Sequence, residues 1–243
     1  MLNPKIIKTR FEKSLKNYKA NAVVQKSMAE DLTYEIIKVK SDYGNVLELG
    51  CGAGVLTEVL SKSIVYKKYY TNDLTEKSEN YVRKYLKDTV FYAGNALKIK
   101  PACKFDLIAS NAMFQWLNLN DMCLKAKQLL SKGGILAFST FGADNCQEIR
   151  DITGLTLDYK DKDEIINIFS KDFDILCSKE QKSFMEFKTP LELLAHMKNT
   201  GVNSLNDTCW TISDVKDFCD KYSKKYERVR LTYSPMIFTM RLK

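Results

Sequence analysis

The chain has 243 residues, of which 45% are hydrophobic and 28% charged, and its formal net charge is +8. This length and composition predict one ordinary soluble α/β domain rather than two. No apolar run approaches the roughly 20 residues that cross a bilayer, and residues 1–19 lack the apolar core of a secretory signal. We therefore expect a cytoplasmic protein that does not bind a membrane.

The cysteines argue against a disulfide framework or a zinc site. They are odd in number, they form no C-x-x-C pair, and the single histidine, His196, has no cysteine near it in the sequence. We expect no metal, and free thiols at Cys51, Cys103, Cys123, Cys146, Cys177, Cys209 and Cys219.

The first element expected in chain order is a helix capped by Asn21, because an apolar stripe recurs at every fourth residue after it. The stripe comprises Val24, Met28, Leu32 and Ile36.

From residue 45 onward, short apolar strands alternate with helical segments. This alternation predicts a parallel sheet covered by helices on both faces. The expected strands are 45–49, 69–73, 90–93, 105–110 and 135–141, and the expected helices are 54–62, 75–88 and 119–132.

After residue 160 the pattern changes. Residues 173–187 are strand-like, and 189–201 begin with Thr-Pro and end on Gly201, as a helix does. A helix over 213–225 and a strand within 231–242 complete the chain. No linker or break in composition appears, so residues 1–243 are expected to form a single domain.

Residues 46–57 read "VLELGCGAGVLT" and place Gly50, Gly52 and Gly54 directly after a strand. A dinucleotide fingerprint, G-x-G-x-x-G, would need glycine where Val55 stands, which leaves a glycine turn of some other nucleotide fold as the alternative. The pattern E-x-G-x-G-x-G, beginning at Glu48, resembles motif I of the class I S-adenosylmethionine (SAM) methyltransferases.

That resemblance implies a fold and a cofactor. The fold is a three-layer sandwich around a seven-stranded, mostly parallel, Rossmann-like sheet with an antiparallel last strand. The turn, including Glu48 and Cys51, would wrap the methionine and ribose end of SAM, and S-adenosylhomocysteine would be the product.

Asp73 lies 23 residues after Gly50, at the end of the second expected strand. A carboxylate there can accept hydrogen bonds from both ribose hydroxyls, as in dinucleotide folds. Leu74 would then lie against the adenine. Asn95, followed by Ala96, stands where such methyltransferases often carry an acid that contacts the adenine amine, and it keeps an amide oxygen as acceptor.

Several further segments together resemble the malonyl-[acyl-carrier protein] O-methyltransferases of biotin synthesis. The most specific are "SNAMFQWL" (110–117) and "HMKNTGVN" (196–203), and 10–32, 139–150 and 231–238 also fit. The resemblance implies methylation of the free carboxylate of a malonyl thioester on a carrier protein, the first step toward pimelate. It further implies that residues 1–40 form a helical lid and that 189–226 add helices near the substrate.

The implied chemistry needs no general base, because a carboxyl group with a pKa near 4 is already an anion at neutral pH. Catalysis would rest on positioning. Tyr18 and Gln25 could meet the cofactor or substrate from the N-terminal segment. Asn111 and Gln115 could line the pocket after the fourth strand, where Asn111 would also reach the cofactor.

Two further positioning residues are candidates. Arg150 could pair with the malonyl carboxylate through its two-pronged guanidinium group, and His196 could act from its helix. A surface arginine and a packed histidine are the alternatives. Phe114 and Trp116 are expected in the core rather than at the substrate.

The positive charge is concentrated near the C-terminus. Residues 216–243 hold eight basic residues and three acids. Such a surface would suit a weak, charge-steered complex with an acidic acyl carrier protein, and we expect no nucleic-acid partner.

Three other functions remain open from the residues alone. The chain could methylate another small carboxylic acid or a quinone-type acceptor. It could methylate nucleic acid, as its pI of 9.0 suggests, although neither an RNA-binding module nor an N/D-P-P-Y/F motif is visible. It could also be a non-catalytic assembly factor, but such proteins often lose the glycine loop or the ribose acid, and both are intact here.

Overall fold

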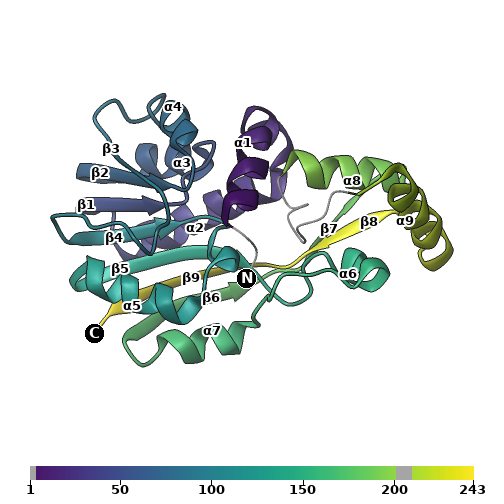
Figure 1. Ribbon diagram of the computed structural model, residues 1–243. Coiled ribbons are helices and arrows are strands. Elements are labelled where there is room, and N and C mark those ends of the chain that lie inside the picture. Colours follow the sequence, from purple (N-terminus) through teal and green to yellow (C-terminus); the bar gives the residue numbers. More distant parts are fainter. Residues whose placement is uncertain (1–3, 201–209) are drawn as a thin grey trace.

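The computed structural model describes residues 4–200 and 210–243. The chain begins with two helices, α1 (Pro4–Asn21) and α2 (Val23–Val39), which precede the sheet (Figure 1). The expected cap at Asn21 is wrong. Asn21 is the last residue of α1, and its side-chain amide donates a hydrogen bond to the Asn17 carbonyl oxygen inside that helix at 2.7 Å, so α2 begins after Ala22 without a side-chain cap.

Seven strands form one sheet in the order β3-β2-β1-β4-β5-β9-β6. Only β9 runs antiparallel to its neighbours, β5 and β6, which confirms the expected sheet. The strands are β1 (Asp42–Leu49), β2 (Val65–Asp73), β3 (Val90–Ala93), β4 (Phe105–Ser110), β5 (Leu130–Phe141), β6 (Phe173–Glu180) and β9 (Pro235–Leu242).

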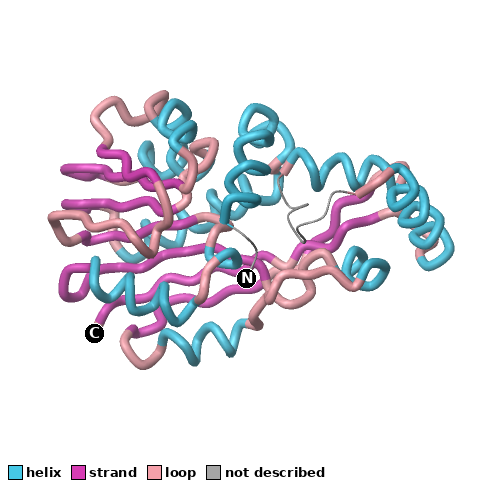
Figure 2. Tube along the Cα trace, viewed as in Figure 1, coloured by secondary structure: helices cyan, strands magenta, loops and turns pink. Residues whose placement is uncertain are grey.

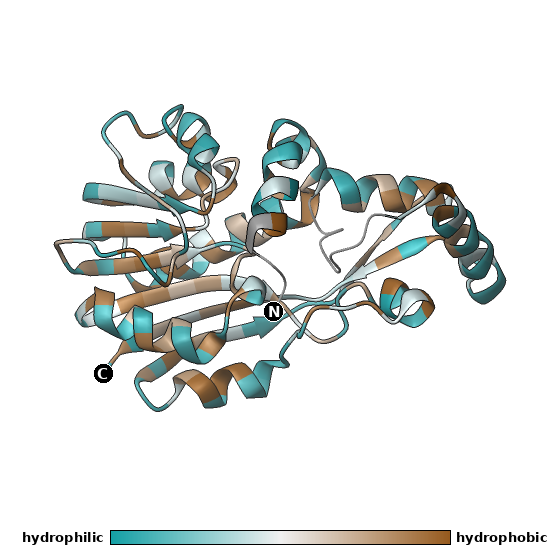
Figure 3. Cartoon of the chain, in the orientation of Figure 1, coloured by the Kyte–Doolittle hydropathy of each residue, from teal (hydrophilic) through white to brown (hydrophobic). Residues whose placement is uncertain are grey.

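Helices cover both faces of the sheet. One face packs against α2 and α3 (Val55–Ser63), and the other against α5 (Leu119–Leu129) and α7 (Lys162–Phe169). The central strands are hydrophobic along most of their length (Figure 3), as expected for strands buried on both faces. This is the expected three-layer sandwich.

Two predicted helices are shorter than expected. Over 75–88 only η1 (Glu76–Ser78), α4 (Glu79–Val82) and a few turns form, and Leu86, which follows α4, is buried at 4% exposure. The helix predicted to reach residue 132 ends at Leu129, since β5 already begins at Leu130.

The described elements between β6 and β9 build a lobe beyond the sheet, which we call the C-terminal arm. It consists of β7 (Ser183–Glu186), α8 (Pro190–Asn199), α9 (Ile212–Lys225) and β8 (Arg230–Tyr233). β7 and β8 pair in a separate two-stranded sheet, drawn in magenta on the right of Figure 2. The strand predicted over 173–187 is thus two strands in two sheets, and Gly201, the predicted helix end, lies outside the described residues.

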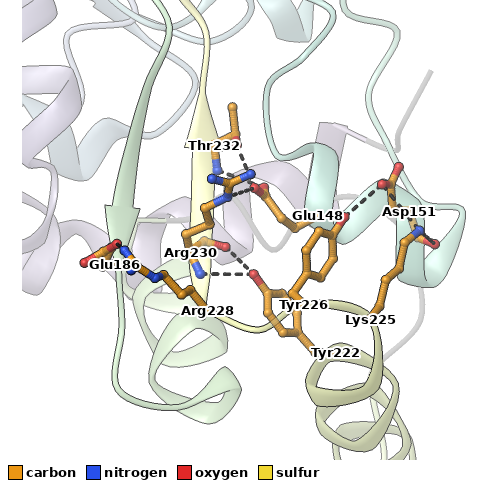
Figure 4. Close-up of polar contacts among 9 residues, drawn as sticks. All are labelled: Glu148, Asp151, Glu186, Tyr222, Lys225, Tyr226, Arg228, Arg230 and Thr232. Atoms are coloured by element: carbon orange, nitrogen blue, oxygen red, sulfur yellow. Dashed lines mark hydrogen bonds and ion pairs between the residues drawn. The ribbon is translucent and has the colours of Figure 1, made fainter.

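A buried carboxylate ties the arm to the helix α6 (Gln147–Thr153). Glu148 of α6 is 0% exposed and accepts hydrogen bonds from the backbone N–H of Thr232 at 2.8 Å and from its hydroxyl at 2.6 Å. The Arg230 guanidinium lies 3.5 Å from the same carboxylate, and the Tyr222 hydroxyl of α9 donates a hydrogen bond to the Arg230 carbonyl oxygen (Figure 4). These contacts fix α6 and α9 against β8.

In the described part of the chain, no helix is long and apolar enough to cross a bilayer, and no cluster of potential metal ligands is found. The six cysteines among these residues are free thiols, and Cys209 lies outside them.

Candidate active site

A cavity of about 400 Å³ lies at the carboxyl ends of the parallel strands, where sheets of this type bind ligands. One wall is α1, whose apolar side chains recur at helical spacing along the face toward the cavity. The loops after β1, β2, β3 and β4 form the rest. From α1 the lining residues include Ile7, Phe11, Leu15 and Tyr18, and from the loops Gly50, Cys51, Gly52, Asp73, Leu74, Asn95, Ala96 and Asn111.

The turn after β1 is built from bare backbone. Gly50, Gly52 and Gly54 have φ values of +69°, +50° and +76°, in the left-handed region that disfavours other residues. A Cβ atom on Gly50 would stand 2.6 Å from Cγ of Met113, so this position has no room for a side chain. Gly50 and Gly52 line the cavity, whereas Gly54 caps the start of α3 and does not line it.

Asp73 is joined to this turn. Its Oδ2 accepts a hydrogen bond from the backbone N–H of Gly52 at 2.8 Å, and its Oδ1 accepts one from the backbone N–H of Thr75 at 2.9 Å. Burial raises the pKa of the Asp73 carboxyl, while the backbone hydrogen bonds oppose that rise. Contacts with the Leu74 backbone N–H and the Ser78 side chain also oppose the rise. The carboxylate lines the cavity, so it can accept hydrogen bonds from hydroxyl groups of a ligand there.

Glu48, near the end of β1, connects the strand that precedes the turn to its neighbours. Its carboxylate accepts hydrogen bonds from the hydroxyls of Thr57 at 3.0 Å and Tyr69 at 2.8 Å, which joins β1 to α3 and β2. Burial raises the pKa of Glu48 to about 7. Glu48 borders the cavity, but both of its oxygens hold the framework, so its visible role is to position the turn.

Tyr18 projects from α1 into the same cavity. Burial, with a contribution from the negative charge of Asp73, raises the pKa of its hydroxyl above the usual 10. The hydroxyl therefore stays protonated at neutral pH and can donate a hydrogen bond. Within the described residues it has no hydrogen-bond partner of its own.

Leu74, Asn95 and Ala96, from the loops after β2 and β3, line another part of the cavity. The Asn95 Oδ1 accepts a hydrogen bond from the backbone N–H of Leu97 at 2.8 Å, which shapes the loop after β3. That oxygen retains one lone pair, and the amide nitrogen of Asn95 makes no hydrogen bond within residues 4–200 and 210–243.

Asn111 connects the cavity to α2. Its Nδ2 donates a hydrogen bond to the Gln25 carbonyl oxygen at 2.9 Å, and its Oδ1 accepts one from the Ser139 hydroxyl at 2.5 Å. The Gln25 side chain is 3% exposed and does not line the cavity, so Gln25 meets the site through its backbone.

A second cavity of about 470 Å³ adjoins the first and shares Ile7, Trp116, Leu117 and Asn118 with it. Gln115 lines this second cavity: it accepts a hydrogen bond from the Thr140 hydroxyl at 3.2 Å and donates one to the Ala112 carbonyl oxygen at 2.7 Å.

Trp116 lines both cavities, whereas the sequence predicted that it would lie in the core. Its ring packs edge-on against Phe11 with the ring centroids 5.7 Å apart, and its buried indole nitrogen has no hydrogen-bond partner among the described residues. Phe114, in contrast, is a core residue, 0% exposed and stacked on Phe138. An indole N–H in the loop that follows β4, the strand that ends at the site, was the signal that could have singled out Trp116.

Arg150 and His196 line neither cavity. Arg150, on α6, donates a hydrogen bond to the Ala143 carbonyl oxygen at 2.6 Å. His196, on α8, lies with its Nε2 2.6 Å from the Tyr233 hydroxyl, and burial lowers the pKa of its imidazole. The structure therefore does not bring these two candidates to the walls where the other site residues meet.

Comparisons with known proteins agree with this geometry. A family model described as a methyltransferase domain matches residues 47–138. The malonyl-[acyl-carrier protein] O-methyltransferase of Calditerrivibrio nitroreducens is 36% identical, over 95% of this chain and 94% of its own. The Haemophilus influenzae enzyme of the same name is 34% identical, over 97% of this chain and 93% of its own.

Solved structures share the fold at much lower identity. The N-methyltransferase NodS of Bradyrhizobium japonicum, in complex with S-adenosyl-L-homocysteine, aligns over 97% of this chain and 98% of its own with a TM-score of 0.60 at 14% identity. A putative methyltransferase from Bacillus halodurans aligns over 86% of this chain and 97% of its own with a TM-score of 0.63 at 13% identity.

Proposed function

The chain belongs to the malonyl-[acyl-carrier protein] O-methyltransferase family, and on that premise we propose that it methylates malonyl-[acyl-carrier protein] with SAM as the methyl donor. The methyl group goes to the free carboxylate of the malonyl thioester, and the methyl ester starts pimeloyl synthesis for biotin. The observation that carries this proposal is the bare glycine turn hydrogen-bonded to Asp73, beside a second cavity that can admit an acceptor.

The residues present fit SAM. The positive-φ turn leaves room for a ligand against the backbone, and the Asp73 carboxylate lines the cavity, where it can accept hydrogen bonds from the ribose hydroxyls. Leu74, with the loop that carries Asn95 and Ala96, would hold the adenine. Gly50, Cys51 and Asn111 would hold the methionine end. When bound, SAM supplies a methyl group on a positively charged sulfur.

The protein then has to position the acceptor and keep water out. The malonyl carboxylate is already ionised at neutral pH, so no side chain has to remove a proton. A cavity wall with apolar residues such as Phe11, Leu15 and Trp116 excludes water, which strengthens the attraction between the anionic oxygen and the donor. Correct alignment can contribute about 7–11 kcal/mol at most.

We place the acceptor in the second cavity, because it shares the Trp116 wall with the first. Gln115 faces that cavity, and the protonated hydroxyl of Tyr18 can donate a hydrogen bond from the donor side. Arg150 and His196 line neither cavity, so the proposal gives the positioning work to Tyr18, Asn111 and Gln115. We further propose that the carrier protein binds transiently through its acidic surface, in the cytoplasm.

The proposal is tested by incubating the purified protein with SAM and malonyl-carrier protein and measuring the intact mass of the carrier. We expect the gain of one methyl group, which mild ester hydrolysis removes again. Holo-carrier protein without the malonyl group is the control and should not change. Methylation of free malonate with no reaction of the carrier-bound form would contradict the assignment.

A further inference from the structure

Helix α1 carries more positive charge than any other helix described. Its 18 residues include six basic side chains and a single acid, Glu12, a net charge of +5 on a chain whose total is +8. Glu12 is itself paired with Lys77, 2.7 Å away. The sequence pattern alone drew attention to the C-terminal residues instead.

The two faces of α1 differ. Ile7, Phe11, Leu15 and Tyr18 line the cavity, whereas Lys13 and Lys16 are exposed to solvent. The spacing explains this separation, since residues three and four apart share one side of a helix. Within the described residues, neither Lys13 nor Lys16 makes an ion pair, so both charges are available to a partner. Lys8 lines the first cavity and makes no ion pair within 4 Å in the described residues, although its charge helps to lower the pKa of Glu12.

The basic residues of the C-terminal arm are placed differently. Figure 4 shows three of them beside acids: Lys225 near Asp151 at 3.4 Å, Arg228 near Glu186 at 3.8 Å and Arg230 near Glu148 at 3.5 Å. Lys221 pairs with Asp217 in the same way, at 2.7 Å. These pairings neutralise much of the arm's positive charge.

Arg241, near the C-terminus, lies at the edge of the sheet away from the two cavities. Because β9 runs antiparallel, Arg241 pairs in register with Ile135 near the start of β5, at the edge opposite the glycine turn. Figure 1 shows α9 at the far end of the arm, whereas α1 stands beside the carboxyl ends of β1 and β2. A carrier protein must dock where its thioester arm can reach the cavities, and Ile7 of α1 borders both of them.

We propose that the exposed lysine face of α1, formed by Lys13 and Lys16 and continued by Lys8 at the cavity rim, is the surface on which the acidic carrier protein docks. This inference rests on the proposed function. The carrier then docks on the helix that forms the cavity wall, and not on the basic C-terminal third that the sequence indicated. Docking there places the carrier on the outer side of the helix whose inner side lines the cavity.

Charge reversal on α1 tests this surface against a matched control on α9. The test variant is Lys13→Glu with Lys16→Glu, and the control is Lys216→Glu with Lys224→Glu, which makes the same change of charge at exposed residues without ion pairs in the described part of the chain. The dissociation constant of fluorescently labelled malonyl-carrier protein and kcat/KM are measured for each. Malonyl-pantetheine, a thioester without the acidic protein, serves as the second substrate.

We expect the α1 variant to lose at least about tenfold in binding and in kcat/KM for the carrier protein, because steering by opposite charge changes association by factors of 10 or more. Its kcat/KM for malonyl-pantetheine should stay within about twofold of wild type, and added salt should reduce the difference on the carrier protein. The α9 variant should behave like wild type.

Two results would overturn the docking surface: an α1 variant that binds the carrier like wild type, or an α9 variant that shows the larger loss. Circular dichroism of both variants establishes that they are folded. If the wild-type protein binds the carrier in an α1-dependent way but transfers no methyl group, the proposed function fails while the docking surface stands.

Discussion

The carboxylate of Asp73 accepts a hydrogen bond from the backbone N–H of Gly52 at 2.8 Å. The two residues are 21 positions apart in the chain, and they meet because β1 and β2 are neighbouring parallel strands that end at the same edge of the sheet. Asp73 thus shapes the turn on which we propose that the cofactor lies, and in that proposal its carboxylate accepts hydrogen bonds from the ribose.

We predict that Asp73→Ala weakens SAM binding by roughly 1.5–3 kcal/mol, the usual range for a hydrogen bond to a charged group. Isothermal titration calorimetry measures the change. Asp106→Ala is a suitable control, because Asp106 accepts a hydrogen bond from the backbone N–H of Asn45 at 2.9 Å, in a similar way but without lining the cavity. Equal losses in the two variants would mean that Asp73 acts only on stability.

We predict that Gly50→Ala lowers both stability and SAM affinity, since the new Cβ would meet Met113 at 2.6 Å in a backbone with φ of +69°. Gly133→Ala isolates the backbone effect, because Gly133 has φ of +71° and nothing lies within 4 Å of its added Cβ. Gly133→Ala should lose only the roughly 1–2 kcal/mol of left-handed strain and bind SAM normally. Thermal unfolding measures the stability of the two variants, and calorimetry measures their SAM affinity. An unchanged SAM affinity in Gly50→Ala would count against the site.

Glu48 should make stability depend on pH. Burial raises its pKa from 4.5 to about 7 in the folded protein, so over that interval the folded state binds more protons than the unfolded state. The free energy of unfolding contributed by Glu48 is therefore greatest below pH 4.5 and falls as pH rises to about 7.

The Glu48→Gln variant tests this dependence, because glutamine resembles the protonated carboxyl group and cannot ionise. We expect it to remove most of the decline in stability between acidic and neutral pH. Urea unfolding of the cofactor-free protein at several pH values measures the slope. A variant that keeps the wild-type slope would show that other groups cause it.

Methyl transfer should be nearly independent of pH from about pH 6 to about pH 9, because the acceptor carboxyl titrates near 4 and the pKa of Tyr18 is raised above its usual 10. We expect Tyr18→Phe to raise the activation free energy for kcat by about 1 kcal/mol, the net value of one hydrogen bond. The pH profile should not change. Single-turnover rates across the pH range check both statements. A rate that rises with a pKa near 7, and does so also in the Glu48→Gln variant, would instead indicate a general base.

Much of the fold follows from local pattern. The strands predicted at 90–93 and 105–110 coincide with β3 and β4, and the glycine turn with Asp73 marks the cavity. What the sequence could not provide depends on tertiary contacts. Glu148 is buried by β8, 84 residues away, so α6 and its Arg150 sit apart from the cavities.

Helix α1 is a second case in which tertiary contacts decide. Its lysines are scattered through the first 20 residues, and only the fold shows which of them face solvent beside the cavity. Trp116 similarly reads as one more apolar residue after a strand, and its place between the two cavities appears only once α1 is packed against it.

The central claim is tested most directly by a crystal structure of the protein with S-adenosyl-L-homocysteine. The account predicts that the ribose hydroxyls lie within hydrogen-bond distance of the Asp73 carboxylate and that the homocysteine part lies along Gly50–Gly52. The adenine should contact Leu74, and the sulfur should face the wall at Trp116. Ligand bound elsewhere, or a cavity that stays empty at saturating concentration, would contradict it.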